Sequence, residues 1–515
     1  MSEATRPAVV PEILRRQANV HGDRPAIVVD RGGPLDAPAA LSFSGWARAA
    51  DALAGALARR GVRKGDRVAL VFENGDADRF HVGYFAALAA GAVAVPVGVR
   101  LAGAEMDRIL HHAEPRLALG GLRQAEAISR LGVPGLTVLG PAEVDEAIAG
   151  GLPAPEVVLG PEDLADILYT SGTTGTPKGV CSTHGNLLTI HAGGFKPFAG
   201  RVWLHGVPVH TFAGTHAMQY LPLRAGMTIV VQHQFDPLRW LALAASRQAA
   251  VAYAVPAMLR LIVDAWDATP PTKRPDLSSL AMLLFGAAAM PPATFARLPE
   301  LFPAAMLVNL YGLTESGSAT CAMPPGEAAA RPGSVGVPVP PTEVRVVAEG
   351  ERECAPGEVG EIRIRGPGSV RRYYRAPEET ARTFLPGGWV RTGDLGHLDA
   401  DGYLYLDGRQ KELVNRGGLK VFVDELDSLL AAHPAVLEAA VAGVAHPVLG
   451  EDLAAYVVVR PGHAVSADEL CAFLAARVAD YKVPRRWTFV AALPRNSMGK
   501  VMRRQLAGLA PLPGG

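Results

Sequence analysis

The sequence predicts an α/β protein with a large N-terminal domain of mainly parallel sheets and a small α+β domain at the C-terminal end. Helix and strand patterns alternate through most of the chain before residue 338, where short strands divided by Gly and Pro turns begin. The pattern changes again after Arg409, where helices and strands are mixed. The 515 residues, 49% hydrophobic and 19% charged, suffice for several domain-sized cores.

The N-terminal elements follow from capping residues and apolar runs. Ser44 is expected to cap a helix that ends before Gly61, and residues 66–72 form the apolar run of a buried strand. Further on, a strand, a helix and a second strand succeed one another at the spacing of a right-handed βαβ unit. These three elements are expected over residues 280–285, 291–301 and 305–310.

The remaining chain divides into two smaller parts. Residues from about 338 to 409 contain four short strand patterns and are expected to form a β subdomain. This subdomain completes an N-terminal domain over 1–409, whose α/β subdomains extend to about residue 337, and residues 410–515 are expected to form a mobile α+β lid domain. The lid is predicted to contain a helix over 424–432, strands over 437–444 and 454–459, a helix opened by a capping box of Ser466 and Glu469, and a strand over 487–490.

Charge and cysteine usage exclude several classes of protein. Lys and Arg together number 50, as do Asp and Glu, so the balanced charge gives no footprint for nucleic acid or an anionic membrane. The four cysteines lie far apart without metal-ligand spacing, which favours free thiols in a reducing compartment. The N-terminus has no apolar signal region, and the longest apolar stretch, 84–99, is too short to span a membrane. We therefore expect a soluble cytoplasmic protein.

The most informative segment is YTSGTTGTPKGV, over residues 169–180. Its glycines allow backbone N–H groups to approach an anion, its hydroxyls add donors, and Lys178 adds charge, so the segment suits a polyphosphate. Its spacing does not fit the Walker A pattern, which disfavours a P-loop NTPase.

Together with four later motifs, this segment resembles the adenylate-forming superfamily of acyl-CoA synthetases, adenylation domains and luciferases. The later motifs are YGLTE at 311–315, TGD at 392–394, GRQKE at 408–412 with Gly417-Gly418, and NSMGKV at 496–501. They follow the order of the family over nearly the whole chain. The resemblance implies ATP-dependent activation of a small-molecule carboxylic acid to an acyl-adenylate, with pyrophosphate release. Transfer to a thiol, most readily that of coenzyme A, then gives a thioester and AMP.

The nucleotide site is expected from the motif residues and their chemistry. Tyr311 presents a flat face to adenine, Asn309 offers both donor and acceptor to its edge, and Asp394 can accept from ribose hydroxyls. Thr314 can bind a phosphate, and Glu315 is a hard oxygen ligand suited to Mg²⁺. The full set expected to bind ATP or AMP is Thr170, Ser171, Gly172, Thr173, Thr174, Gly175, Lys178, Gly286, Ala287, Ala288, Asn309, Tyr311, Gly312, Thr314, Asp394, Arg409 and Lys500.

The resemblance also assigns residues to the reaction itself. Lys500 corresponds to the lysine that bridges the substrate carboxylate and the α-phosphate, and the position of Lys411 to a hinge between domains. The segment of Gly417 and Gly418 is expected to contact coenzyme A, and His210 to lie beside the activated carboxylate. The catalytic residues are expected to be Lys500, His210, Glu315 and Thr314. The acyl pocket is expected to draw on His210, Thr211, Phe212, Ala287, Ala288, Ser318 and Ala319. The pocket residues other than His210 are uncharged, and they therefore indicate a largely apolar aryl or medium-sized aliphatic acid.

Three alternatives remain at this point. An adenylating enzyme can load a separate phosphopantetheinyl carrier protein instead of coenzyme A, and a luciferase-type oxidoreductase shares the adenylation step. A non-catalytic nucleotide sensor would lose the reactive residues, whereas Glu315, Asp394, Arg409 and Lys500 are all present.

Overall fold

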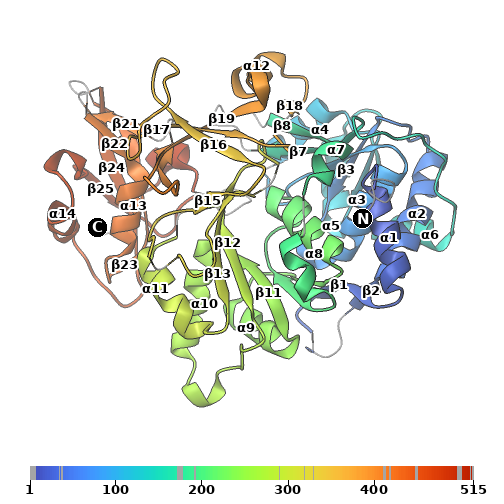
Figure 1. The fold of residues 1–515 in the computed structure, drawn as a ribbon, viewed down its shortest axis with the longest axis horizontal. Helices are drawn as coiled ribbons and strands as arrows, with labels where there is room; N and C mark the ends of the chain where they lie inside the picture. The colour runs from blue at the N-terminus through green and yellow to red at the C-terminus, as the bar shows by residue number, and fades with distance from the viewer. Residues whose placement is uncertain are drawn as a thin grey trace.

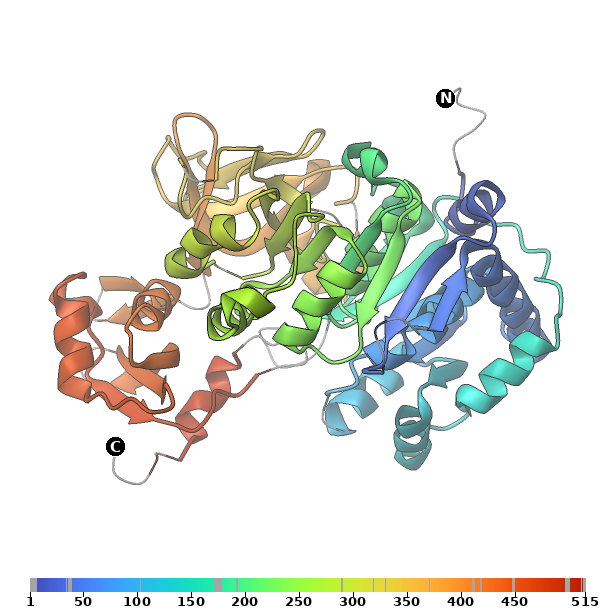
Figure 2. The ribbon, with the colours of Figure 1, turned by 90° about the horizontal axis from the view of Figure 1, so that it is seen from below.

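A computed structural model shows how these segments are arranged (Figures 1 and 2). It describes residues 7–33, 35, 39–101, 103–170, 178–190, 193–288, 290–317, 319–328, 330–369, 371–409, 413–416, 419–446, 450–495, 501–510 and 512. The described strands form four sheets, two of them large and mainly parallel. The expected α/β class, with a large N-terminal part and a small C-terminal one, is therefore confirmed.

The first large sheet has seven strands and leads into the proposed phosphate loop. Its order is β18 (Arg372–Tyr373), β8 (Lys178–Thr183), β7 (Leu164–Thr170), β4 (Val93–Pro96), β3 (Arg67–Val71), β5 (Leu117–Gly120) and β6 (Thr137–Leu139). The strands from β7 to β6 pair in parallel, whereas β8 and β18 are antiparallel additions. Four helices belong to this half: α3 (Ala77–Ala89), α4 (Gly103–Ala113), α5 (Leu122–Leu131) and α6 (Pro141–Ala149).

The second large sheet has nine strands. Its order is β15 (Val337–Pro338), β14 (Ala319–Ala322), β13 (Met306–Gly312), β12 (Met282–Gly286), β11 (Ala249–Ala254), β9 (Val202–His205), β10 (Thr228–Gln232), β1 (Pro25–Asp30) and β2 (Ala39–Ser42). Its helices are α1 (Pro11–His21), α2 (Phe43–Arg59), α8 (Met218–Ala225), α9 (Pro237–Ser246), α10 (Pro256–Ala268) and α11 (Pro292–Leu301). The short helix α7 (His184–Leu188) contacts β8 of the seven-stranded sheet. Strands β12 and β13 pair in parallel around α11, so the predicted βαβ unit is confirmed.

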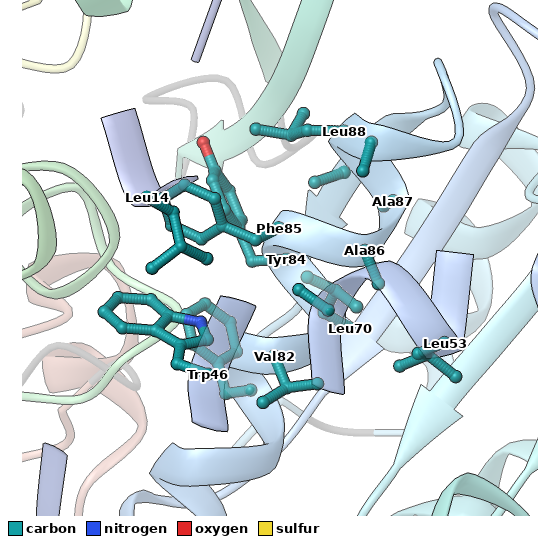
Figure 3. Packing of buried hydrophobic residues seen from close by; sticks show 14 of the residues in the cluster. Leu14, Trp46, Leu53, Leu70, Val82, Tyr84, Phe85, Ala86, Ala87 and Leu88 are labelled. Carbon is teal, nitrogen blue, oxygen red and sulfur yellow. The ribbon is translucent and has the colours of Figure 1, made fainter. Parts of the chain in front are cut away.

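One apolar core joins the two large sheets. Figure 3 shows side chains of α1, α2 and α3 meeting in it, with Trp46 against Phe85 at a ring-centroid distance of 5.1 Å. Leu70 on β3 and Ile229 on β10 belong to the same cluster, so it contacts both sheets. Each large apolar side chain buried here contributes about 1.5–3 kcal/mol, which fixes the frame on which the site is built.

The helix predicted to be capped by Ser44 begins two residues earlier, with Ser42 as its cap. Ser42 has extended backbone, and its hydroxyl accepts from the backbone N–H of Gly45 at 3.0 Å, whereas Ser44 lies inside α2 and its hydroxyl donates to Asp23. Two serines two residues apart offer the same cap, and the pairing of β2 decides between them. The capping box of Ser466 and Glu469 is as predicted.

Two smaller sheets complete the chain. The four-stranded sheet consists of β16 (Glu343–Val347), β17 (Gly360–Arg365), β19 (Trp389–Leu398) and β20 (Leu404–Arg409), with α12 (Pro377–Thr383) beside it. The C-terminal sheet consists of β21 (Leu413–Arg416), β22 (Leu419–Phe422), β23 (Val436–His446), β24 (Gly450–Val459) and β25 (Arg486–Phe489), with helices α13 (Val423–Ala431) and α14 (Ala467–Ala475). Figure 2 shows this last group, in red, at the end of the molecule opposite α1 and α2.

The C-terminal group meets the rest of the chain at α10. The Arg260 guanidinium reaches the carbonyl oxygen of Val436 at 3.5 Å, and Arg460 lies 4.0 Å from the Asp264 carboxylate. A cavity of about 350 Å³ lies beside these contacts, between α10, α11 and the end of α13. Both contacts with α10 involve charged side chains, and α13 and β22 also lie against β20 of the four-stranded sheet.

Two further sequence predictions can be compared with the structure. The four cysteines are free thiols, as expected. Across the part of the chain that the structure describes, no helix has both the length and the apolar character needed to cross a membrane.

Candidate active site

The proposed phosphate loop lies at the tip of the hairpin formed by β7 and β8. Thr170 and Lys178 are cross-strand partners, and the Thr170 hydroxyl points to the Lys178 carbonyl oxygen at 3.5 Å. The buried residues of both strands fix the hairpin, so the two ends of the loop are held side by side. The loop residues Ser171, Gly172, Thr173, Thr174 and Gly175 lie outside the described residues.

Lys178 and Glu315 meet at one tyrosine that the sequence analysis did not select. The Lys178 ammonium lies 5.1 Å from the ring centroid of Tyr373, and the Tyr373 hydroxyl donates to Glu315 at 2.9 Å. Tyr373 itself belongs to β18, which pairs with β8. The structure therefore brings the proposed phosphate lysine and the proposed metal ligand to one phenol group, the lysine over its ring and the carboxylate at its hydroxyl.

The turn after β13 carries the YGLTE motif. The Ser316 hydroxyl accepts from the backbone N–H of Leu313 at 3.1 Å and fixes the turn. Thr314 is buried and Gly312 is exposed. The turn places Glu315 between buried neighbours, half-exposed, where its carboxylate can still reach a ligand.

The proposed adenine site lies where β12 and β13 end side by side. A side chain on Gly286 would lie 2.3 Å from the carbonyl oxygen of Leu310, so only glycine allows this approach. Ala287 follows with a φ of 69°, which is strained for a residue other than glycine, and Ala287 and Ala288 are both exposed. Asn309 donates its amide N–H to the Ser334 carbonyl oxygen at 3.0 Å. Its amide oxygen is consequently the group that suits the adenine amine.

The proposed ribose site combines β13 with the four-stranded sheet. The Tyr311 hydroxyl donates to Asp394 at 2.7 Å, and both residues are buried. Thr392 accepts from the Asp394 backbone N–H at 3.0 Å, which orients the TGD turn. Arg409 is the cross-strand partner of Asp394, although its side chain lies outside the described residues. Residues from three separate motifs, Tyr311, Asp394 and Arg409, therefore lie next to one another in the fold.

The proposed acid segment runs from His210 into a π-helical turn over Ala213–Ala217. Burial, with a smaller effect from Arg100, lowers the pKa of His210 to about 4, so its imidazole is neutral at physiological pH. The Thr211 hydroxyl donates to the Pro208 carbonyl oxygen and accepts from the Gly214 N–H, so it serves the turn. The Phe212 ring lies edge-on to His216. The side chains of Ser318 and Ala319 lie outside the described residues.

A buried polar network ties this segment to the strand before the phosphate loop. The Asp166 carboxylate on β7 accepts from the Tyr84 hydroxyl at 2.7 Å and lies 2.6 Å from Nε2 of His216. Tyr220 donates in turn to Tyr84 at 3.1 Å. Burial acts to raise the pKa of Asp166, but the charge of His216 and the hydrogen bonds from His216, Tyr84 and Ser182 outweigh it and lower the pKa. The sequence analysis did not select these residues. The signal that could have found them is a single aspartate, Asp166, within an apolar strand.

Arg371 extends the network toward Glu315. It is buried, and its guanidinium donates to the Ser182 hydroxyl and to the Gly368 carbonyl oxygen. Burial lowers its pKa, while the charges of Asp166 and Glu315 act in the opposite direction. The positive charge of Arg371 is thus near enough to interact with both carboxylates, and its hydrogen bond to Ser182 ties it to β8.

The donor set can be compared with the needs of Mg²⁺. Within the described ranges, no group of three or more His, Cys, Asp or Glu side chains is arranged to hold a metal ion. Mg²⁺ in nucleotide enzymes usually takes one or two carboxylates and completes its shell with phosphate oxygens and water. Glu315, a single carboxylate near the phosphate lysine, fits that arrangement.

Besides the residues of the phosphate loop, four more residues of the predicted machinery lie outside the described residues. They are Lys411, Gly417, Gly418 and Lys500, and their roles stay predictions.

Comparisons with known proteins agree with the motifs. The family model described as AMP-binding enzyme matches residues 14–374, and that of the AMP-binding enzyme C-terminal domain matches residues 425–500. A 2-succinylbenzoate–CoA ligase from Geobacillus kaustophilus is 33% identical over 98% of this chain and 98% of its own. A fatty acid–[acyl-carrier-protein] ligase from Streptomyces coeruleorubidus is 31% identical over 90% of this chain and 91% of its own.

A solved structure gives the same result for the fold. The o-succinylbenzoate CoA synthetase from Bacillus subtilis, solved with its acyl-adenylate intermediate, superposes with a TM-score of 0.85 at 26% identity, covering 98% of this chain and 99% of that chain. Two family models in succession, full-length relatives and the shared fold all point the same way. This chain belongs to the AMP-binding enzymes, the adenylate-forming superfamily that its motifs resemble.

Proposed function

We propose that this protein is an AMP-forming acid–thiol ligase that converts a carboxylic acid, through an acyl-adenylate, to its coenzyme A thioester. The single observation that carries the proposal is that Lys178 and Glu315 contact the same tyrosine, Tyr373. A lysine suited to phosphate near a carboxylate suited to Mg²⁺ supports binding of Mg²⁺·ATP. Membership of the AMP-binding enzymes supports the same reaction.

In the first half-reaction, a carboxylate oxygen of the acid attacks the α-phosphorus of ATP, and the bond to the pyrophosphate oxygen breaks. The proposed roles are Lys178 and the loop 171–177 for the phosphates, and Asp394 with Arg409 for the ribose. The Asn309 amide oxygen accepts from the adenine amine, beside the backbone of Gly286, Ala287 and Ala288. Glu315 would hold a Mg²⁺ ion, which would supply charge neutralisation to the triphosphate. Lys500 is proposed to neutralise charge between the carboxylate and the α-phosphate, where two anions must approach.

In the second half-reaction, the thiol sulfur attacks the carbonyl carbon of the acyl-adenylate, loses its proton, and AMP leaves. The lid domain, taken as residues 410–515, is proposed to turn at Lys411, which withdraws Lys500 and brings the segment of Gly417 and Gly418 to the thiol arm. The neutral imidazole of His210 can hydrogen-bond the substrate carboxyl group without adding a charge.

The acid is proposed to be a largely apolar aryl or medium-sized aliphatic one. Phe212 and the exposed Ala287 and Ala288 offer apolar surface, and the Thr211 hydroxyl is already used by the turn. Pyrophosphate release with a panel of acids tests this class. Preferred turnover of an amino acid or malonate would overturn the proposed acid class while leaving the ligase reaction intact.

The acceptor needs its own comparison, because one of the relatives loads an acyl-carrier protein. The purified protein, with its preferred acid and Mg²⁺·ATP, is offered coenzyme A or a phosphopantetheinyl carrier. We expect the thioester with coenzyme A. Loading of the carrier with no coenzyme A thioester would favour the second function. Oxygen consumption with the adenylate would instead indicate luciferase-type chemistry.

A further inference from the structure

Tyr373 lies at a junction between two elements far apart in the sequence. It ends the two-residue strand β18, where it pairs with Val180 on the strand that begins with Lys178. Its backbone N–H donates to the Thr380 hydroxyl at 3.0 Å, and its ring lies edge-on to Phe384 at 5.3 Å. The side chain is thus fixed from its own backbone and from α12.

The two functional ends of this side chain contact opposite charges. The hydroxyl donates to Oε1 of Glu315, and the ring lies beneath the Lys178 ammonium. Because the Glu315 carboxylate can only accept hydrogen bonds, the Tyr373 phenol is the donor in this contact. Among the described residues, no ion pair joins Lys178 to Glu315 directly. The two groups share the phenol instead of neutralising each other.

This arrangement has a consequence for ligand binding. A carboxylate that receives one hydrogen bond on Oε1 has a fixed orientation and presents Oε2 to a cation. Groups that hydrogen-bond a metal-ligating carboxylate commonly change metal affinity 10–100-fold when removed. An aromatic face stabilises a nearby ammonium without competing for its N–H donors as a carboxylate would.

We propose that Tyr373 is a positioning residue, which orients Glu315 toward the divalent cation of Mg²⁺·ATP and keeps Lys178 available for phosphate. The inference rests on the proposed function and assigns a residue outside its predicted site. The two roles can be tested separately, because the hydroxyl contacts Glu315 and the ring contacts Lys178.

The test compares Tyr373→Phe and Tyr373→Leu with Tyr374→Phe. Tyr374 is the adjacent tyrosine, and its ring contacts His112 instead. Calorimetry measures ATP binding with Mg²⁺ and with chelator, and pyrophosphate release measures the Mg²⁺ concentration that gives half-maximal adenylation. Tyr373→Phe should weaken Mg²⁺·ATP binding and raise the Mg²⁺ requirement about tenfold, while metal-free ATP binding stays within about twofold. Tyr373→Leu should also weaken metal-free binding, and Tyr374→Phe should match the wild type.

Two further variants test whether the Tyr373 hydroxyl acts through Glu315. In a Glu315→Gln background, Tyr373→Phe should have no additional effect on the Mg²⁺ requirement, because the hydroxyl acts through the carboxylate. If Tyr373→Phe does not fold, Thr380→Ala, which loosens the Tyr373 backbone, should give a smaller shift of the same kind. Equal loss of ATP binding with and without Mg²⁺, or an unchanged Mg²⁺ requirement, would overturn the proposal. Failure of the wild type to release pyrophosphate would instead contradict the proposed function.

Discussion

At the scale of single residues, Asp166 is the most consequential side chain outside the motifs. It is fully buried in an otherwise apolar strand and is stabilised by His216, Tyr84 and Ser182. When one partner of a buried ion pair is removed, the charge of the other partner stays unpaired in a medium of low dielectric constant, which is destabilising. The residue therefore couples the stability of the core to the placement of the acid segment.

We expect Asp166→Asn to lower the free energy of unfolding by about 3–5 kcal/mol, measured by urea denaturation. The matched control is Glu162→Gln, which removes an exposed carboxylate four residues earlier. A loss below about 1 kcal/mol for Asp166→Asn would mean that the network is not a stabilising one.

At the scale of elements, the hairpin of β7 and β8 determines where the phosphate loop begins and ends. Thr170 and Lys178 are paired across it, so the loop length and the position of the lysine are fixed by strand register. A lysine at that position can contact the β- and γ-phosphates of ATP, which an acyl-adenylate lacks.

Lys178→Ala should therefore raise the ATP concentration needed for adenylation about tenfold or more, because it removes a charge-assisted phosphate contact. Thioester formation from a supplied acyl-adenylate should change little. Steady-state assays of the two half-reactions measure this, with Lys196→Ala as a control at an exposed lysine. An equal loss in both assays would indicate that the lysine only maintains the hairpin.

The elements also show what the sequence could predict. Long apolar runs and caps located the βαβ unit of β12, α11 and β13 and the capping box of α14, since local patterns decide them. The strand β18 was missed because its two residues gain their conformation only by pairing with β8. Ser42 replaced Ser44 as the cap for the same reason: pairing of β2 selects between equivalent residues.

At the scale of the whole molecule, the motif residues could be found from the sequence. The contacts between motifs, and the residues that link them in space, could not. Tyr311 and Asp394 are 83 residues apart and share a hydrogen bond, which motif order alone does not reveal. Tyr373 and Arg371 fall in a segment of arginines and tyrosines without a distinguishing pattern. Their roles depend on tertiary contacts with Glu315 and Ser182.

Buried neutral histidines should make the folded protein sensitive to acid. Burial lowers the pKa of His81, His184 and His210 to about 4 and that of His205 to about 3. Between pH 6.5 and 4 the unfolded chain binds more protons, so their contribution is complete above pH 6.5 and is lost as the pH falls. For each of these histidines, the free energy of unfolding should fall by about 1–2 kcal/mol between pH 7 and pH 5.

Denaturation at several pH values, with proton uptake on unfolding, measures this effect. Asp427 acts in the opposite direction, because burial raises its pKa to about 7. The histidines outnumber it, so a net loss of stability between pH 7 and 5 is expected. Constant stability over that range would contradict the assignment of neutral histidines.

The two proposed domains should alternate between half-reactions. Lys500→Ala should abolish adenylate formation but leave thioester formation from a supplied acyl-adenylate nearly intact. Lys411→Pro restricts φ at the proposed hinge and should impair the second step more than the first. Single-turnover assays of each half-reaction distinguish them, and an equal fall in both half-reactions for either variant would contradict alternation.

In the proposed reaction, the acid is activated through its own carboxylate oxygen at the α-phosphorus of ATP. Isotope transfer tests this most directly, with the preferred acid labelled with ¹⁸O in its carboxyl group and supplied with Mg²⁺·ATP and coenzyme A. Mass spectrometry of the nucleotide product should find one ¹⁸O atom in the phosphate of AMP, together with unlabelled pyrophosphate. Production of ADP, or AMP without the label, would contradict activation of the acid through an acyl-adenylate.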